Sequence, residues 1–223
     1  MSDQDRAAQP AREPVLNPVD RVSELLFGLF MALTFVGAIS VAESGQAEIR
    51  SLLAAALGCN LAWGLVDAVM YLVRTVTDRG REITLLRSVR TAADAQAGRR
   101  LIGQSLSKTA ARLVSETEIE AIRGRIVALP TVPERPALKG DDLLAALAVF
   151  LLVVVSTFPV ALPFVLFDDV GTAKNVSRAV ALTMLFFGGL ALGRYAGYGS
   201  LRVGFLMAGL GTALVAAVMA LGG

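Results

Sequence analysis

Residues 143–167 read LLAALAVFLLVVVSTFPVALPFVLF and contain no charged side chain. A helix needs about 20 apolar residues to cross the hydrocarbon of a bilayer, and this run exceeds that length. Four further apolar runs occur at 22–41, 51–73, 179–193 and 203–221. The apolar fraction of the whole chain is 55%, above the level usual in soluble domains. The sequence therefore predicts an all-α membrane protein with five transmembrane helices.

The distribution of Lys and Arg predicts the orientation of these spans. With the N-terminus in the cytoplasm, 18 of the 21 basic residues fall in cytoplasmic segments and 3 fall outside. Such a bias follows the positive-inside rule. Residues 1–21 carry charges and three prolines but no apolar core, so we interpret them as a flexible tail and not as a signal peptide. We expect a multi-pass protein of the cell (inner) membrane with its C-terminus outside.

Between the second and third spans, residues 74–142 mix charged and apolar residues at helical spacing. We expect a cytoplasmic helical segment here, between transmembrane helices 1–2 (22–73) and 3–5 (143–223). Its apolar positions suggest one helix with Ile83, Leu86 and Val89, and another with Leu113, Ile119, Ile122 and Ile126. Prolines end the second helix, at Pro130, Pro133 and Pro136. The segment is either a helical hairpin or a surface for anionic lipid, which its arginines Arg79, Arg81, Arg87 and Arg90 would favour.

Several classes of function are disfavoured by composition. The chain has no histidine and one cysteine, Cys59, so a Ser/His/Asp triad, a disulfide framework and a cysteine-based zinc cluster are excluded. Its Gly-rich pieces lack the strand and the lysine of a phosphate-binding loop. We therefore predict that the protein is not an enzyme, holds no resident cofactor and binds no nucleic acid. An ion site would have to use carboxylates, amides, carbonyls, hydroxyls or methionine sulfur.

Two carboxylates fall inside predicted spans, where charge is costly and usually functional or paired. Glu24 lies in the first span and Asp67 in the second, at similar depth if the two helices are antiparallel neighbours. Asn60 shares a helix face with Asp67 and with Met70 or Tyr71, and Met31 shares one with Glu24. Oxygen ligands suit hard divalent ions, and thioether adds a preference for softer metals such as Fe(II). The predicted metal site consists of Asp67, Glu24, Met70, Met31 and Asn60.

Structural roles for the same side chains stay open. Glu24 can snorkel to the interface near Arg21, and Asp67 can bond Tyr71 or pair with an arginine. Proline kinks in the third span can free carbonyls for neighbouring hydroxyls or for an ion. Small residues predict close helix packing in the last two spans. Gly189, Gly193 and Gly197 lie four residues apart, and Gly204, Ala208 and Gly211 line one face of the last span.

Three stretches carry a resemblance to a known family. The first is Leu26–Leu29, which reads LFGL. The second has two parts: Val160–Phe164 reads VALPF, and Phe187–Leu190 reads FGGL. The third is Gly199–Arg202, which reads GSLR. With the five-span topology, they make the chain similar to the vacuolar iron transporter family over roughly residues 20–222. The resemblance implies a homodimer with the first two spans at its centre, where Asn60 of the two chains would be close enough to crosslink. It also implies export of Fe(II) or Mn(II) from the cytoplasm in exchange for protons.

The chain also departs from this family's pattern. The Asp-Gly of the first span falls on Phe30 and Met31, and the Glu of the second span falls on Met70. Residues 75–142 contain no methionine, unlike the metal-capturing domain of eukaryotic members. The alternatives are therefore a membrane scaffold that no longer transports, or a transporter of another substrate. In either case the bilayer itself is a partner.

Overall fold

The computed structural model describes residues 18–41, 46–197 and 199–221, and these residues form helices and connections with no strand. Most of the predicted tail lies outside them, but residues 18–21 belong to the first helix and not to a tail. The chain divides into two compact units. We call Met1–Tyr71 with Asp141–Gly223 the span unit, and Leu72–Gly140 the connecting unit.

Within the described ranges, five helices are long and apolar enough to cross a membrane. These are α2 (Pro18–Val41), α3 (Gln46–Arg90), α7 (Gly140–Ala161), α9 (Val170–Tyr195) and α10 (Ser200–Ala220). The all-helical class and the five apolar spans are thus confirmed, and the chain is a multi-pass membrane protein. α2 begins with a proline, whose missing N–H costs nothing in a first helical turn.

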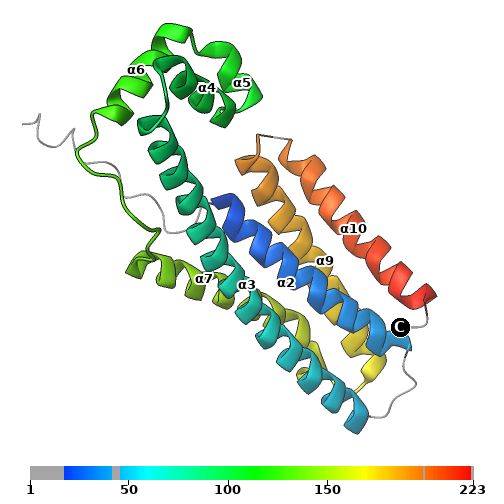
Figure 1. Cartoon of the computed structure of the whole chain (residues 1–223). Helices are drawn as coiled ribbons and strands as arrows, with labels where there is room; N and C mark the ends of the chain where they lie inside the picture. Colours follow the sequence, from blue (N-terminus) through cyan, green and yellow to red (C-terminus); the bar gives the residue numbers. More distant parts are fainter. Residues whose placement is uncertain (1–17, 42–45, 198, 222–223) are drawn as a thin grey trace, which may run out of the picture. The chain divides into compact units, whose positions relative to one another are not determined.

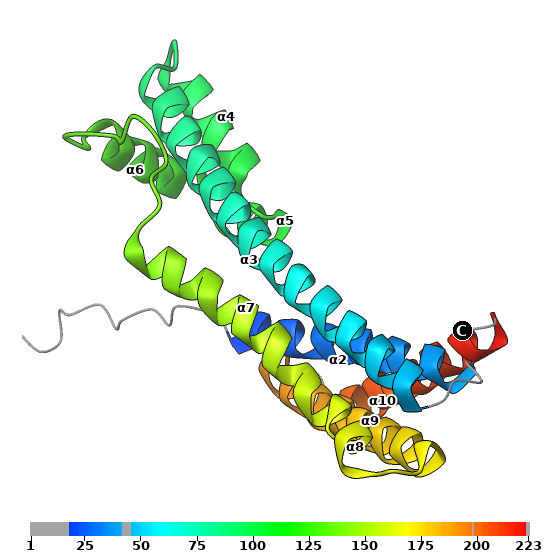
Figure 2. The same ribbon diagram turned by 90° about the horizontal axis from the view of Figure 1, so that it is seen from below.

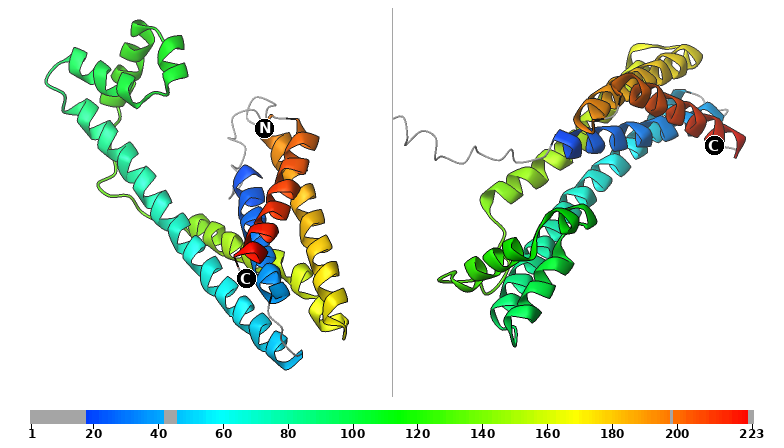
Figure 3. Two further views of the ribbon diagram at one scale, coloured as in Figure 1. Left: turned by 90° about the vertical axis from the view of Figure 1, so that its right-hand side faces the viewer. Right: turned by 90° about the horizontal axis from the view of Figure 1, so that it is seen from above.

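The core of the span unit lies among α2, α9 and α10, which run side by side in Figures 1 and 3. Leu29 and Leu33 of α2 and Leu185 of α9 are fully buried there, and Val215 of α10 is 5% exposed. The buried residues of α2 recur every three or four positions, which places them on one face of the helix. That face of α2 joins α9 and α10 into one bundle.

Glycines bring α9 and α10 into close contact. A Cβ atom built on Gly189 would lie 2.8 Å from the Gly204 Cα atom, and one on Gly193 would lie 2.8 Å from the Ser200 Cα atom. The predicted packing role is therefore confirmed for these glycines. It is wrong for Gly197, which has φ of 73° in the turn after α9 and would place a Cβ near no other atom.

Prolines divide the third span, as the sequence predicts. Pro159 lies within α7, and Pro163 opens the short helix α8 (Pro163–Leu166) that leads into α9 (Figure 2). Ser177 of α9 is fully buried and donates a hydrogen bond to the Val160 carbonyl oxygen at this break. A hydroxyl on another helix therefore satisfies a carbonyl beside the break.

The connecting unit differs from the predicted pair of helices. Ile83, Leu86 and Val89 continue α3, which has no proline to stop it before Arg90. Three short helices follow, gathered together in Figure 3: α4 (Ala95–Ser105), α5 (Lys108–Leu113) and α6 (Glu116–Val127). Each begins at a side-chain cap, and these caps are Asp94, Ser107 and Ser115.

Two sets of contacts organise this unit. Glu120 of α6 binds Arg99 of α4 at 2.9 Å and Arg123 at 2.6 Å, which links the two helices. The proline-rich connector after α6 returns antiparallel to α3. Its carbonyl oxygens accept hydrogen bonds from Arg87, at Pro133, and from Arg79, at Ala137. Arg81 also pairs with Asp78 at 3.6 Å, so three of the four arginines considered for lipid binding are engaged within the protein.

Candidate functional site

The polar residues of α3 lie on the face that packs inside the span unit. Asn60 is only 2% exposed, Gly64 and Ala68 are buried, and Tyr71 packs against the cluster formed by Ala145 and Val149 of α7. Met70, by contrast, is 49% exposed. Where the helical spacing allowed either residue on the polar face, the structure thus places Tyr71 on it and turns Met70 outward.

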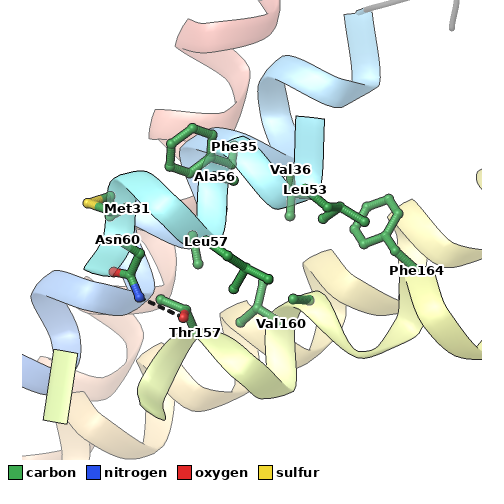
Figure 4. Close-up of a pocket in the computed structure, with 12 residues that line it drawn as sticks. Met31, Phe35, Val36, Leu53, Ala56, Leu57, Asn60, Thr157, Val160 and Phe164 are labelled. Carbon is green, nitrogen blue, oxygen red and sulfur yellow. Dashed lines mark hydrogen bonds between the residues drawn. The ribbon is translucent and has the colours of Figure 1, made fainter. Parts of the chain in front are cut away.

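Asn60 is held by one hydrogen bond to α7. Its side-chain nitrogen donates to the Thr157 hydroxyl oxygen at 2.8 Å, as Figure 4 shows. The Thr157 hydroxyl in turn donates to the Val154 carbonyl oxygen at 2.8 Å, so its oxygen is left to accept from the amide. This order of donors fixes the amide so that Oδ1 points away from Thr157.

The amide oxygen of Asn60 is a buried acceptor without a hydrogen-bond partner in the described part of the chain. Such atoms are uncommon inside proteins, and a small ligand or water often accounts for them. From the sequence alone, Thr157 is one of the hydroxyl residues near the proline kink of the third span. No local pattern connects it to Asn60, because the two lie 97 positions apart.

A cavity of about 30 Å³ adjoins this amide between α2, α3, α7 and α8 (Figure 4). It is large enough to hold a water molecule. Thr157 and Asn60 are its polar members, and Met31 contributes a thioether. The other lining residues are apolar: Ala32, Phe35, Val36, Leu53, Ala56, Leu57, Val160, Ala161 and Phe164. A small polar species in this cavity would therefore depend on the amide oxygen.

Among the five predicted site residues, Met31 and Asn60 line this cavity together. Glu24 on α2 and Asp67 on α3 are half-buried, and each already makes an interaction within the protein. Asp67 follows Asn60 by two helical turns, about 10 Å along the axis. Within the described ranges, no group of three or more carboxylates or thiols is placed to hold a metal ion.

Two glycines bring α2 and α3 against α7 beside the site. A Cβ atom on Gly28 would lie 2.9 Å from the Val153 carbonyl oxygen and would also contact the Ser156 side chain. One on Gly64 would lie 3.3 Å from the Phe150 carbonyl oxygen. Gly28 of the LFGL stretch therefore allows helices to approach closely.

Asp169, at the end of the third span, has a structural role. Its carboxylate accepts a hydrogen bond of 2.7 Å from the Thr172 backbone nitrogen and caps α9. Hydrogen bonds from Thr172 hold the pKa of this carboxyl below its usual range.

No protein-family model matches the chain, and no curated protein matches it.

Proposed function

We propose that this protein is a transporter that moves a divalent transition metal ion, Fe(II) or Mn(II), out of the cytoplasm. The observation that carries the proposal is the buried amide oxygen of Asn60, which lacks a hydrogen-bond partner within the described residues and adjoins a small cavity between four helices. An amide buried in an apolar span is costly, and evolution retains such groups chiefly where they serve a function.

The chemistry of the neighbouring groups favours a divalent cation. The oxygen of Asn60 is a hard ligand, the thioether of Met31 is a soft one, and Fe(II) and Mn(II) accept oxygen ligands. Asp67, two turns further along the same face, supplies negative charge that an ion in a low-dielectric setting needs. A carboxylate that binds the ion also binds protons, which supports exchange of protons for metal.

A homodimer is part of this proposal, because the donors of one chain form an incomplete ligand set. α3 presents a second, exposed face with Trp63, Val66, Met70 and Val73 at spacings of three and four. Two copies meeting along this face would add a second set of ligands near the first, with Met70 brought inside. The resemblance to the vacuolar iron transporter family gives the same arrangement of spans.

Orientation is proposed from charge. With the N-terminus and the connecting unit in the cytoplasm, 18 of 21 basic residues face the cytoplasm. A cysteine at Gln96 should then react with a membrane-impermeant maleimide only from the cytoplasmic side, and one at Leu221 only from the other side. Reaction of both from one side contradicts the orientation.

One observation favours a different function, that of a membrane scaffold. No cluster of three acidic or thiol side chains lies ready for a metal within the described ranges, and Phe30 and Met31 replace the Asp-Gly of the resembling family. A scaffold would need neither. The amide oxygen of Asn60 would then be satisfied by a structural water.

Metal flux in proteoliposomes tests these alternatives. The purified full-length protein is reconstituted with a metal-sensing dye inside, and Fe(II) or Mn(II) is added with and without a pH gradient. A transporter gives flux above protein-free vesicles, and a proton exchanger gives more flux with the gradient. Background flux for both metals in correctly inserted protein contradicts the proposed transport and favours the scaffold.

A further inference from the structure

Positive charge in the connecting unit is concentrated on α4 and α5. Residues 95–114 contain four basic side chains and no Asp or Glu. Arg99 is bound to Glu120. The other three, Arg100, Lys108 and Arg112, are exposed and form no salt bridge within the described residues. Three exposed cations without a salt bridge among the described residues therefore lie on these two helices, with Glu116 of α6 lining the same pocket as Arg100.

An apolar side chain projects from the same surface. Leu113, the last residue of α5, is 78% exposed, and Arg112 precedes it. The other exposed large apolar residues of the unit, Val73 and Val127 among them, are at most 49% exposed. A leucine beside cations fits an interface where an apolar tip enters lipid and the charges meet headgroups.

Space for a polar headgroup adjoins this surface. A groove of about 600 Å³ lies between the end of α3 and α4, within the connecting unit. Arg81 and hydroxyl residues such as Thr84, Ser88 and Ser105 line it. It reaches the C-terminal end of α4, from which α5 begins three residues after Ser105. Arg81 already pairs with Asp78 at 3.6 Å, and the Thr84 and Ser105 hydroxyls donate to backbone carbonyls, so the groove contributes space for a headgroup more than free donors.

We propose that the α4–α5 surface binds anionic phospholipid headgroups, with Leu113 inserted among them. Charge decides the occupant: α4 and α5 themselves carry four basic side chains and no Asp or Glu, and an anionic headgroup complements the three that are exposed. The interaction is separate from metal transport. It assigns lipid binding to α4 and α5, because Arg79 and Arg87 of α3 already bind the connector.

A fluorescent label at residue 113 tests this proposal in the full-length protein. Cys59→Ala removes the single cysteine, and Leu113→Cys then accepts an environment-sensitive dye. The protein is placed in nanodiscs of phosphatidylcholine alone or with phosphatidylglycerol, each with brominated lipid as a quencher. We expect stronger quenching and a blue shift in the anionic discs, and loss of both at high salt.

Matched variants separate lipid binding from other causes. Replacing Arg100, Lys108 and Arg112 by Gln should lower quenching in anionic discs to the level of neutral discs, whereas Arg125→Gln on α6 should leave it unchanged. A label introduced by Val127→Cys should stay unquenched. Equal quenching at 113 in both kinds of disc, or quenching that survives the triple substitution, overturns the proposal. Shielding of the dye without quenching in either lipid would indicate a protein contact instead and also overturns it.

Discussion

Asn60 and Thr157, 97 positions apart in the sequence, share a hydrogen bond of 2.8 Å that joins α3 to α7. Thr157→Val should remove the only acceptor of the Asn60 amide nitrogen among the described residues and leave both ends of the amide unsatisfied. We expect a loss of about 1–3 kcal/mol in the free energy of unfolding, the usual cost of a stranded buried donor. Unfolding of the detergent-solubilised protein by a denaturing detergent measures it.

Asn60→Leu is the informative comparison. It removes the donor and the unsatisfied oxygen together at similar volume, so it should cost less stability than Thr157→Val. The same variant should lose metal flux if the amide oxygen is a ligand. Asn60→Leu with unchanged flux would show that the cavity lies off the transport path.

Asp67→Asn should strongly reduce metal flux and leave insertion intact, because it keeps the side-chain shape and removes the charge that a divalent ion needs. The matched control is Asp78→Asn, eleven residues further along α3 and exposed. Glu24→Gln should reduce flux less, since Glu24 lies nearer the end of its span. Metal-sensing dyes in proteoliposomes measure all three, and full flux in Asp67→Asn would assign the ion another path.

Met31→Leu and Met70→Leu should change the preference among metals more than they change the overall rate of transport, because a thioether selects softer ions. Competition between Fe(II), Mn(II) and Co(II) in the same vesicles provides the measurement. A drop in rate without a change in preference would contradict a ligand role for the sulfur.

Dimer formation should be detected by the single native cysteine. Asn60 is buried and bound to Thr157, so a crosslink between two Asn60 positions is the less accessible test. Its neighbour Cys59 is exposed. Mild oxidation in membranes should yield a disulfide-linked dimer of the unmodified protein, and Cys59→Ala should abolish it. A monomer in lipid by cysteine crosslinking and by light scattering would refute the α3 dimer.

Gly189→Ala should destabilise the α9–α10 contact by about 1–3 kcal/mol, because the new methyl group meets backbone atoms that cannot rotate away. Gly209→Ala is the matched control on α10, where a Cβ atom would contact nothing. That change should be neutral or stabilising by up to about 1 kcal/mol, since alanine favours helix. Equal destabilisation by both substitutions would contradict the assigned contact.

The pairing of α4 with α6 should weaken in acid. Hydrogen bonds from Arg123 and Arg99 lower the pKa of Glu120 from 4.5 to about 2. The contribution of this carboxylate is therefore complete above pH 4.5 and lost as the pH falls toward 2. Hydrogen-exchange protection of α4 and α6 should fall over that range, and Glu120→Gln should lower protection at neutral pH and remove the pH dependence. Glu116→Gln serves as the control.

The sequence predicted the spans well because their signal is local. Residues 143–167 and the other apolar runs identify themselves by length and by the absence of charge, and glycine spacing identified the close contact of Gly189. α3 was less predictable. Its charged residues after Arg74 mark the end of an apolar run, but charge does not end a helix, so α3 continues to Arg90.

The candidate site was harder to predict because tertiary packing decides it. Helical spacing placed both Met70 and Tyr71 near the polar face of α3, and only contact with α7 separates them. Ser177 and Thr157 have no sequence signal for their partners, which lie on other helices. α4 was missed since its start depends on the cap at Asp94, a local hydrogen bond in a polar stretch.

The antiparallel return of the connector along α3 has a consequence for how the chain could be divided. Arg79 binds the Ala137 carbonyl oxygen, and a Cβ atom on Gly80 would lie 3.8 Å from the Pro136 ring. α3 and the returning connector are therefore neighbours at this point. Residues 81–135 therefore form an insertion whose two ends meet, as in domains that tolerate excision. A short glycine-rich turn could replace them, which would give a minimal five-span protein.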